Sequence, residues 1–422
     1  MTWIKHWAER EAGVNGRPLV IKFGGTSVGG GAQFIRAATM AADAARERPL
    51  TVVVSAMSGT TDTLLGFARN TFGILDTGNS ANGEGGDAVA ELRRSLAERH
   101  LKAASEAVSE EYLPEVEERL DEVLDRLVEA IEAPAVNPAA RKARIAVFGE
   151  RLSSVILAGA IRSRGTPAAV VAEDPIATGP EFSASDVKPE QTRERCERYV
   201  APMLDDGIVA VVPGYVGRSP EGLPTTLGRG GSDLSATVLG RALDSDEVWI
   251  MSDVDGVLDA DPRLVPDAAL LPQLSYREAG DFASLGAKVL HPKTMEPASE
   301  TGIEVHVRNT FAPDRPGTRV ADIEEGPGVR CVALRRNFAV ELPCVSRRHR
   351  KEAAAIVGIG QPDEKDLARG RRSLRKAGIE AVHSGIAPAG LVFVVFEEVA
   401  DEALRVLHGS VIIAPTAAGE VA

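Results

Sequence analysis

The sequence is poor in cysteine, has no long apolar run and carries fewer basic than acidic residues. Its three cysteines, Cys196, Cys331 and Cys344, lack metal-ligand spacing, which predicts free thiols in a reducing compartment. No apolar run approaches the roughly 20 residues of a membrane-spanning helix, and the first residues lack a charged-then-apolar signal pattern. The net charge of −13 argues against a nucleic-acid or anionic-membrane partner. We therefore expect a soluble, cytoplasmic protein.

Two familiar phosphate-binding patterns are also missing from the most informative stretch, Lys22–Ser27. This stretch has neither the Walker spacing GxxxxGK[ST] nor the dinucleotide pattern GxGxxG. It ends a predicted buried strand and turns sharply, and a Gly-Gly pair after a strand is often only a tight turn. Its residues nevertheless suit a transferring phosphoryl group, because they offer a cation, exposed backbone N–H groups and hydroxyls: Lys22, Gly24, Gly25, Thr26 and Ser27.

Short apolar runs alternate with helical patterns over most of the chain, which at 422 residues is long enough for two or three domains. Residues 62–133 are mainly helical in pattern, with a polar, glycine-rich interruption near 78–86. The alternation favours an α/β fold with a mostly parallel sheet. Strands are predicted at 19–23, 50–56, 168–171, 208–213 and 247–252, and helices at 32–46, 113–131 and 232–243.

The last ninety or so residues have a different pattern, after a turn cluster at 323–328. They predict a small two-layer βαββαβ unit, and an open edge or face of such a unit often associates with a second copy. Its strands are expected at 353–358, 379–384, 391–396 and 411–414, and its helices at 363–377 and 400–407.

The glycine-rich segment Gly228–Asp233 precedes the predicted helix at 232–243. Exposed N–H groups at a helix start bind anions, and Arg229 adds a planar fork that suits a carboxylate or a phosphate. Asp233 can orient a cationic group such as Lys22. A glycine-rich turn with a helix cap is the plain alternative, but an arginine between glycines favours a binding role.

Three more segments add groups that a phosphoryl-transfer site needs. Ser252 and Asp253 end a strand, where an acidic group can hold Mg²⁺ or a ribose hydroxyl, although the segment also reads as a plain turn. Lys288 is a second candidate phosphate-binding lysine, and Glu150 begins a helix at the rim of a site. Because phosphoryl transfer depends on positioning and charge neutralisation, these segments together favour that chemistry.

A set of motifs between residues 17 and 320 also carries a resemblance to a known family. They are KFGGTSV at 22–28, VSAMSGTTD at 54–62, FGERLS at 148–153, TTLGRGGSD at 225–233, SDVDGV at 252–257, ASLGAKVLHPKTMEPA at 283–298 and RNTFAPDRPGT at 308–318. With these motifs the chain resembles the aspartate kinases of the amino acid kinase superfamily. The resemblance implies a three-layer αβα sandwich with a mostly parallel central sheet at 17–322, after an N-terminal extension at 1–16. A single ferredoxin-like ACT domain at 329–414 and a tail at 415–422 would follow.

The resemblance implies ATP-dependent phosphorylation of the β-carboxylate of L-aspartate to 4-phospho-L-aspartate, with Mg²⁺ accompanying ATP. This is the first step toward lysine, threonine and methionine. No protein metal ligands are implied. The implied catalytic residues are Lys22 and Asp233. The implied substrate-binding residues are Ser55, Thr60, Glu150, Tyr215, Arg229 and Ser232. The implied phosphate- and nucleotide-binding residues are Gly24, Gly25, Thr26, Ser27, Gly230, Gly231, Ser252, Asp253, Arg263 and Lys288.

The chain departs from the family pattern in two places. Ser252, Leu258 and Asp259 stand where the family usually has Thr, Tyr and Thr, which bears on nucleotide stacking or preference. One ACT-like unit replaces the usual tandem pair, whose pairing forms the effector site in the family. We therefore expect weak or absent feedback inhibition, and a homodimer or higher homo-oligomer through the ACT-like unit.

Two alternatives stay open. One is a related amino acid kinase that acts on another carboxylate or a carbamate in a specialised pathway, although Arg229 and Glu150 favour an α-amino acid substrate. The other is a non-catalytic ligand-binding homologue, against which the presence of Lys22 and Asp233 argues.

Overall fold

The computed structural model describes residues 16–72, 85–284, 291–338, 353–388 and 390–412. The chain divides into two compact units, Met1–Asp253 with Glu300–Asp314 and Val254–Ser299 with Arg315–Ala422. The predicted α/β fold is confirmed in both. The finer division expected at residues 16, 322, 329 and 414 stays a prediction.

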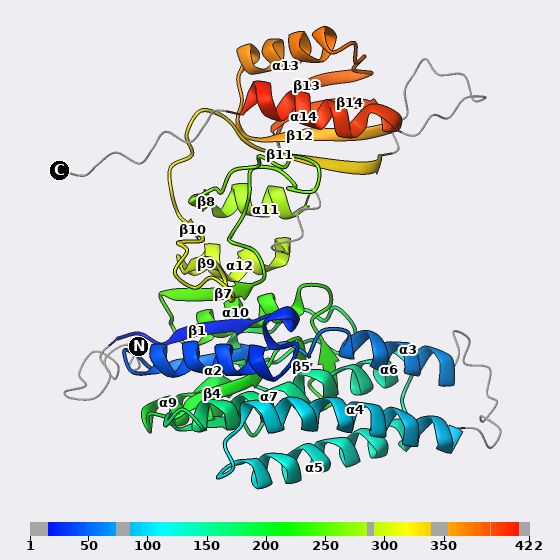
Figure 1. Cartoon of the computed structure of the whole chain (residues 1–422), viewed down its shortest axis with the longest axis vertical. Coiled ribbons are helices and arrows are strands. Elements are labelled where there is room, and N and C mark those ends of the chain that lie inside the picture. Colours follow the sequence, from blue (N-terminus) through cyan, green and yellow to red (C-terminus); the bar gives the residue numbers. More distant parts are fainter. Residues whose placement is uncertain (1–15, 73–84, 285–290, 339–352, 389, 413–422) are drawn as a thin grey trace. The chain divides into compact units, whose positions relative to one another are not determined.

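The first unit is built on a parallel sheet in the order β3-β4-β2-β1-β7-β9 (Figure 1). All residues of β1, β2 and β4 are buried, as expected for parallel strands covered on both faces. Burial on both faces of the sheet is the reason why the sequence has continuous apolar runs at these strands. The strands are β1 (Leu19–Phe23), β2 (Leu50–Val54), β3 (Ala168–Val170), β4 (Val209–Pro213), β7 (Glu247–Ser252) and β9 (Glu304–Asn309).

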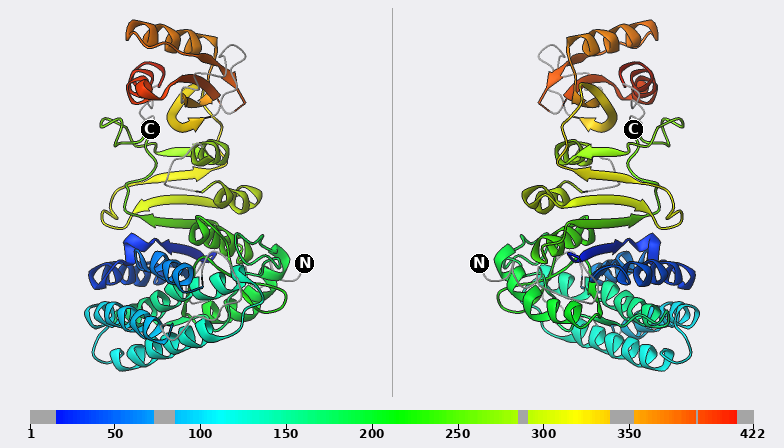
Figure 2. Two further views of the ribbon diagram at one scale, coloured as in Figure 1. Left: turned by 90° about the vertical axis from the view of Figure 1, so that its right-hand side faces the viewer. Right: turned by 90° about the vertical axis from the view of Figure 1, so that its left-hand side faces the viewer.

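Alternate side chains of β1 point into two different helical layers. Leu19, Ile21 and Phe23 belong to the main apolar core, which also contains residues of α2, α4, α5 and α7. Lys22 faces the opposite layer, where α10 packs on β1. Figure 2 shows helices of this unit on both sides of the sheet, which confirms the three-layer αβα sandwich.

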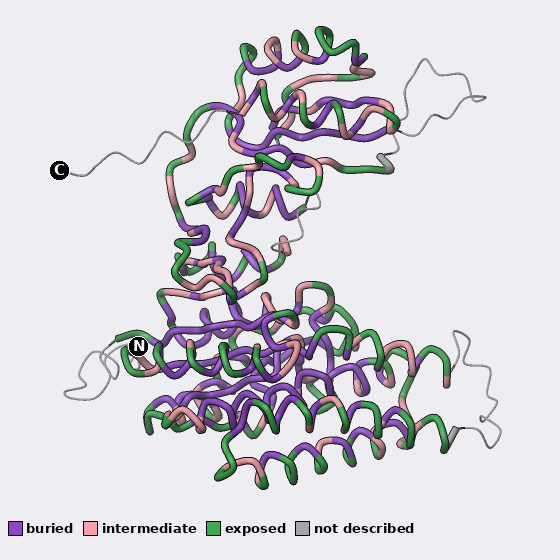
Figure 3. The backbone as a smooth tube through the Cα atoms, viewed as in Figure 1, coloured by how far each residue is buried: buried purple, intermediate pink, exposed green. Residues whose placement is uncertain are grey.

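The helices of the first unit follow the sequence pattern closely. On α5, Val116, Leu120, Leu124 and Leu127 form the buried stripe that the spacing predicts, while acidic residues face outward (Figure 3). The helices are α2 (Gly31–Ala45), α3 (Thr60–Phe72), α4 (Gly85–Ala107), α5 (Leu113–Glu132), α6 (Pro138–Ala146), α7 (Phe148–Arg162), α8 (Pro189–Tyr199), α9 (Ala201–Asp205) and α10 (Gly231–Ala242). A 3₁₀ turn, η1 (Gly25–Val28), and a hairpin of β5 (Val216–Arg218) and β6 (Pro224–Thr226) complete the unit.

The second unit contains the parallel strands β8 (Gln273–Ser275) and β10 (Thr318–Ala321). It also holds a sheet in the order β11-β12-β14-β13, whose neighbouring strands are antiparallel. Its elements are α11 (Tyr276–Ser284), β11 (Gly328–Phe338), β12 (Ala353–Gln361), α13 (Glu364–Lys376), β13 (His383–Ala387), β14 (Gly390–Phe396), η2 (Glu397–Val399) and α14 (Ala400–Val411). Helix α12 (Pro292–Thr301) crosses the boundary between the units.

The predicted last strand of the C-terminal unit, at 411–414, is wrong at its first residue and stays a prediction at residues 413 and 414. Helix α14 continues through Val411, Ile412 makes a single bridge to Val329, and residues 413 and 414 lie outside the described part of the chain. The place beside β12 is filled by β11, which precedes the first strand predicted for the unit, at 353–358. Periodicity alone does not reveal which of two apolar segments pairs with a given strand.

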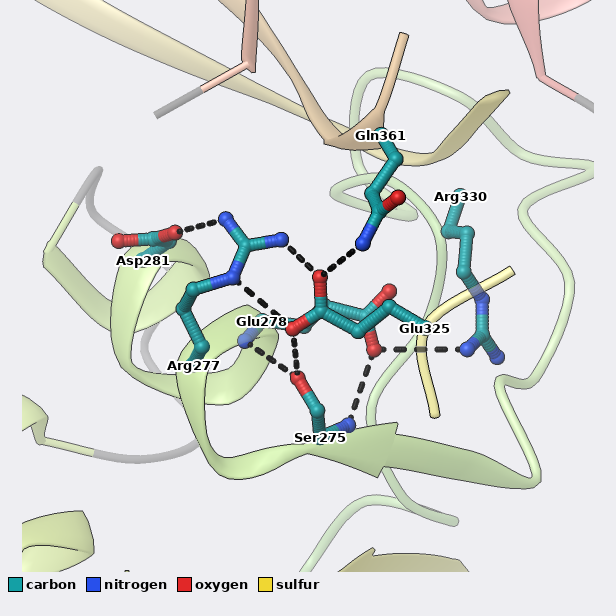
Figure 4. Close-up of polar contacts among 7 residues, drawn as sticks. All are labelled: Ser275, Arg277, Glu278, Asp281, Glu325, Arg330 and Gln361. Atoms are coloured by element: carbon teal, nitrogen blue, oxygen red, sulfur yellow. Dashed lines mark hydrogen bonds and ion pairs between the residues drawn. The ribbon is translucent and has the colours of Figure 1, made fainter. Parts of the chain in front are cut away.

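A polar cluster ties α11 to the segment between β10 and β11 (Figure 4). Ser275 and Glu278 form a reciprocal cap, in which Ser275 Oγ accepts the Glu278 N–H at 3.0 Å and Glu278 accepts the Ser275 N–H at 2.9 Å. Glu325 accepts hydrogen bonds from Ser275 Oγ at 2.6 Å and from Arg277 Nε at 2.9 Å. Arg330 lies 3.4 Å from the fully buried Glu278. The cluster fixes α11 against β11 within the second unit.

No helix among the described residues is long and apolar enough to cross a membrane.

Candidate active site

A cavity of about 270 Å³ lies in the first unit, at the carboxyl ends of β1 and β2 and the start of α10. In parallel α/β sheets this is the edge at which ligands bind. Most of its wall comes from residues predicted from the sequence. The lining residues are Lys22, Ser55, Ala56, Thr61, Glu150, Tyr215, Gly228, Gly230, Gly231, Ser232 and Asp233.

Lys22 and Asp233 form an ion pair at one side of this cavity. Lys22 Nζ lies 2.5 Å from Asp233 Oδ1, and the two side chains are 11% and 15% exposed. Lys22 comes from β1, while Asp233 lies in the first turn of α10, where the helix dipole favours an anion. The lysine is therefore held by a carboxylate and still borders the cavity, so it can meet an incoming phosphate.

Two glycines of the motifs are required by close approach and by backbone geometry. A Cβ on Gly25 would lie 2.9 Å from the carbonyl oxygen of Ala56, so only glycine lets the loop after β1 pass the loop after β2. Gly230 has φ of 71° at the start of α10, in the left-handed region that glycine adopts without strain. These contacts explain why glycines occur at both positions.

Glu150 is a buried carboxyl group in the cavity wall. It lies in the first turn of α7 and accepts a hydrogen bond from the Ala56 backbone N–H. Burial raises the pKa of Glu150 to about 8 from an ordinary 4.5. Its Oε2 atom is buried without a hydrogen-bond partner among the described residues. A buried acid with an open oxygen at a cavity is suited to receive a cationic group of a ligand.

Tyr215 closes another part of the wall with an unusual backbone conformation. Its φ is 67°, which is uncommon for a residue other than glycine, and its N–H donates to Ser235 Oγ at 2.9 Å. Burial raises the pKa of its phenol. Backbone conformations of this kind concentrate at ligand sites.

Several predicted residues do not line the cavity in this structure. Thr60 is fully buried, while the next residue, Thr61, lines the wall. Ser27 is also buried, and its hydroxyl lies 2.7 Å from that of Thr310. Arg229 is exposed, and Thr26 is exposed as well. The sequence did not indicate Thr61, because it does not show which of two adjacent threonines faces the cavity. That depends on the residue at which helix α3 begins.

The predicted nucleotide-binding residues are divided between the two units. Ser252 and Asp253 end β7 in the first unit, where Ser252 Oγ donates to the Asp253 carboxylate at 3.2 Å. Arg263 belongs to the second unit and is ion-paired with Asp261. Lys288 lies outside the described residues.

The unusual Asp259 has a structural environment within the second unit. Asp259 is buried, accepts the Ala269 N–H at 2.9 Å and lies 3.0 Å from His408 Nε2 on α14. Leu258, the other departure, makes a β-bridge to Leu270. Of the three departures from the family pattern, Leu258 and Asp259 therefore occur in a loop whose Asp259 contacts α14, whereas Ser252 ends β7 in the first unit.

Comparison with known proteins gives a consistent set of similarities. A model of the amino acid kinase family matches residues 17–309. Aspartokinase 1 (chloroplastic) of Arabidopsis thaliana is 32% identical over 336 residues, which cover 78% of this chain and 57% of that protein. Lysine-sensitive aspartokinase 3 of Escherichia coli K12 is 33% identical over 321 residues, which cover 76% of this chain and 68% of that protein.

Some relatives extend well beyond the matched region. The match to the maize bifunctional aspartokinase/homoserine dehydrogenase 1 spans 32% of that protein, so the chain spans about a third to three fifths of the plant relatives it matches. Among solved structures, E. coli aspartokinase III in complex with aspartate and ADP has a TM-score of 0.74 at 24% identity. The likeness covers 93% of this chain and 99% of that one, and it supports the fold.

Proposed function

The chain belongs to the amino acid kinase family, and from this premise we propose that it transfers the γ-phosphoryl group of ATP to the β-carboxylate of L-aspartate. The product is 4-phospho-L-aspartate. The observation that carries the proposal is the cavity in which the Lys22–Asp233 pair and the buried Glu150 meet the glycine-rich start of α10. The E. coli and Arabidopsis aspartokinases to which the chain is similar support aspartate as the acceptor.

Each charged group of aspartate has a partner of suitable chemistry in this proposal. The ammonium group pairs with Glu150, whose open oxygen lacks a partner among the described residues. Arg229, exposed beside the cavity, takes the α-carboxylate through its planar fork. The β-carboxylate lies at the N-terminus of α10, where the backbone N–H groups of Gly230 and Ser232 attract an anion, while the Gly231 N–H donates to the Gly228 carbonyl at 3.0 Å.

The chemistry needs charge neutralisation more than proton transfer. A β-carboxylate oxygen forms the new bond to the γ-phosphorus, and the bond from that phosphorus to the bridging oxygen breaks, leaving ADP. The carboxylate is already ionised at neutral pH, so no general base is required. The main barrier is repulsion between two anions, which Lys22 reduces at the point of transfer. Asp233 holds the lysine in place through their ion pair.

The residues of the site fit ATP with its Mg²⁺. Lys22 and the backbone N–H group of Gly25 supply the positive partners that phosphates need, whereas the Gly24 N–H donates to the Met251 carbonyl at 3.2 Å. Among the described residues, no group of three or more His, Cys, Asp or Glu side chains could hold a metal ion by itself. Mg²⁺ commonly binds through substrate phosphates with one or two carboxylates, so here it would arrive with ATP. Asp253 at the end of β7 is the proposed carboxylate.

A coupled ADP-release assay with several acids tests the function. We expect turnover with L-aspartate, and at least about tenfold lower kcat/KM with succinate, which lacks the ammonium group that Glu150 would pair with. Turnover with another acid but not with aspartate would instead support a related kinase of a specialised pathway. Binding of L-aspartate without any ADP release would support a non-catalytic homologue.

Weak feedback inhibition is a further expected result. We propose that the step leads toward lysine, threonine and methionine, and that the C-terminal sheet unit chiefly forms a homodimer. The described residues contain one sheet of the ACT-like order β11-β12-β14-β13, whereas an effector site in the family needs a pair. Millimolar lysine or threonine should therefore leave the steady-state rate almost unchanged, and sedimentation should give a dimer. Strong inhibition by either amino acid would contradict the expectation.

A further inference from the structure

The loop between β2 and α3, residues 55–60, forms one wall of the cavity and is held from several sides. The Ser55 N–H donates to the Phe23 carbonyl at 3.0 Å, and the Ala56 N–H donates to Glu150. The Met57 N–H donates to Ser153 Oγ at 3.1 Å. The neighbouring strand and α7 therefore fix the first half of the loop, up to Met57.

The second half of the loop is contacted by an arginine from α4, in addition to the hydrogen bond from the Thr60 N–H to the Met57 carbonyl at 2.9 Å. Arg99 Nη2 donates to the Ser58 carbonyl at 2.6 Å, and Arg99 Nη1 lies 3.4 Å from Thr60 Oγ1. Gly59 between them has φ of 82°, so the turn depends on a left-handed residue. Arg99 thus contacts residues 58 and 60, which accept or donate no hydrogen bond with α7 in the set described above.

Arg99 differs from the other arginines of its helix in its charge environment. Arg93 is ion-paired with Asp121 and Asp125, and Arg94 is ion-paired with acidic residues of its own helix. No carboxylate in the described part of the chain lies within ion-pair distance of Arg99, which instead contacts a carbonyl and a hydroxyl. Within the described residues, its guanidinium therefore contacts the loop and forms no ion pair with a carboxylate.

The charge of Arg99 lies next to a helix end of the same sign. Helix α3 begins at Thr60, and the partial positive charge of its N-terminus adds to the guanidinium of Arg99. Asp62 in the first turn of α3 supplies one carboxylate at this helix end, and an acidic substrate would bring a second anion to the same positive region. Thr61, which follows Thr60, lines the cavity where the acidic substrate is proposed to bind.

The turn is also in contact with the part of α7 that carries Glu150. A Cβ on Gly149 would lie 3.3 Å from Thr60 Cγ2, so the Thr60 side chain packs directly on the residue before Glu150. A shift of Thr60 would therefore disturb the wall at Thr61 and the position of Glu150 together.

We propose that Arg99 is a positioning residue for the acidic substrate. It fixes the turn at Ser58–Thr60 and adds positive potential beside Thr61. The inference rests on the proposed function for the identity of the acid, but its structural basis is the contact of Arg99 with the loop.

Steady-state kinetics of Arg99→Gln, Arg99→Lys and the control Arg94→Gln test the inference. Arg94 lies on the same helix, is exposed and contacts only residues of α4 in the described structure. Arg99→Gln should raise the KM for L-aspartate about tenfold or more while kcat changes much less, because it removes a charged hydrogen bond and a nearby charge. Arg99→Lys should recover part of the loss. An unchanged KM in Arg99→Gln, or a fall in kcat alone, would overturn the inference.

Two further readouts separate this inference from the proposed function and from simple instability. Raising the salt concentration should narrow the difference in KM between wild type and Arg99→Gln, because the electrostatic part is screened. Hydrogen exchange without substrate should be faster at residues 57–61 in Arg99→Gln than in Arg94→Gln, and equal exchange would contradict the proposal. If the wild type uses a different carboxylic acid, the function is wrong, and the KM for that acid then decides the role of Arg99.

Discussion

Replacing Lys22 with methionine is expected to lower kcat by about 10³-fold or more. Lys22 is the buried cation of the cavity, and a preorganised group that stabilises transition-state charge typically contributes factors of this size. The KM for ATP should rise much less, because backbone N–H groups of the glycine-rich segments remain to bind phosphates. A coupled assay of ADP release at saturating L-aspartate measures the loss.

The ion pair gives this prediction a second observable. Without Lys22, the carboxylate of Asp233 is left in a mostly buried position, which should reduce the free energy of unfolding by about 3 kcal/mol at neutral pH. The double variant Lys22→Met/Asp233→Asn should regain stability without regaining activity. Lys102→Met, at an exposed position on α4, is the matched control and should leave both properties unchanged. Activity that survives in Lys22→Met would contradict the mechanism.

Replacing Glu150 with glutamine is expected to decrease activity and, at higher pH, to increase stability. The variant should lower kcat/KM for L-aspartate about 10²-fold, because the ammonium group loses its charged partner. Because the folded-state pKa of Glu150 is raised to about 8, its contribution to stability is fully present below pH 4.5 and is lost as pH rises through about 8. Glutamine cannot ionise, so the variant does not lose this stability. Between pH 4.5 and pH values above 8, the free energy of unfolding of Glu150→Gln should therefore rise relative to that of wild type by up to about 5 kcal/mol.

Urea unfolding of wild type and Glu150→Gln at pH 5, 7 and 9, values on either side of the raised pKa of Glu150, measures this difference. Glu117→Gln on the exposed face of α5 is the control and should show no such trend. A stability difference that does not change with pH would refute the buried neutral acid. Aspartate binding should also release a proton near neutral pH, because the ammonium group favours the ionised form of Glu150. Calorimetry in buffers of different ionisation enthalpy detects that proton.

Much of the site was predictable because its backbone geometry is local. Gly25 and Gly230 are required by a close approach and by a positive φ, and such requirements leave glycines in the sequence. Lys22 and Asp233 were placed at a strand end and a helix start, and the structure joins them in an ion pair. The α/β class followed from apolar runs whose cause is burial on both faces of a parallel sheet.

Other features could not be predicted because they depend on partners far away in the chain. The burial of Ser27 depends on Thr310, which lies 283 residues later. The order of the C-terminal sheet depends on the pairing of β11 with β12, two segments that local periodicity does not link. The sequence gave no reason to select Arg99, because arginines are common in charged helices. Its role follows only from the hydrogen bond between its guanidinium and the Ser58 carbonyl.

The sequence by itself therefore determined the fold class, the family and the inventory of charged groups and glycines at the strand ends. These follow from side-chain type, short-range periodicity and local backbone conformation. Only the tertiary structure decided that Thr61 lines the cavity while Thr60 is buried. It also decided that burial raises the pKa of Glu150 and that Arg99 contacts the loop. The physical reason is that burial, and with it the protonation and exposure of a side chain, is set by residues distant in sequence.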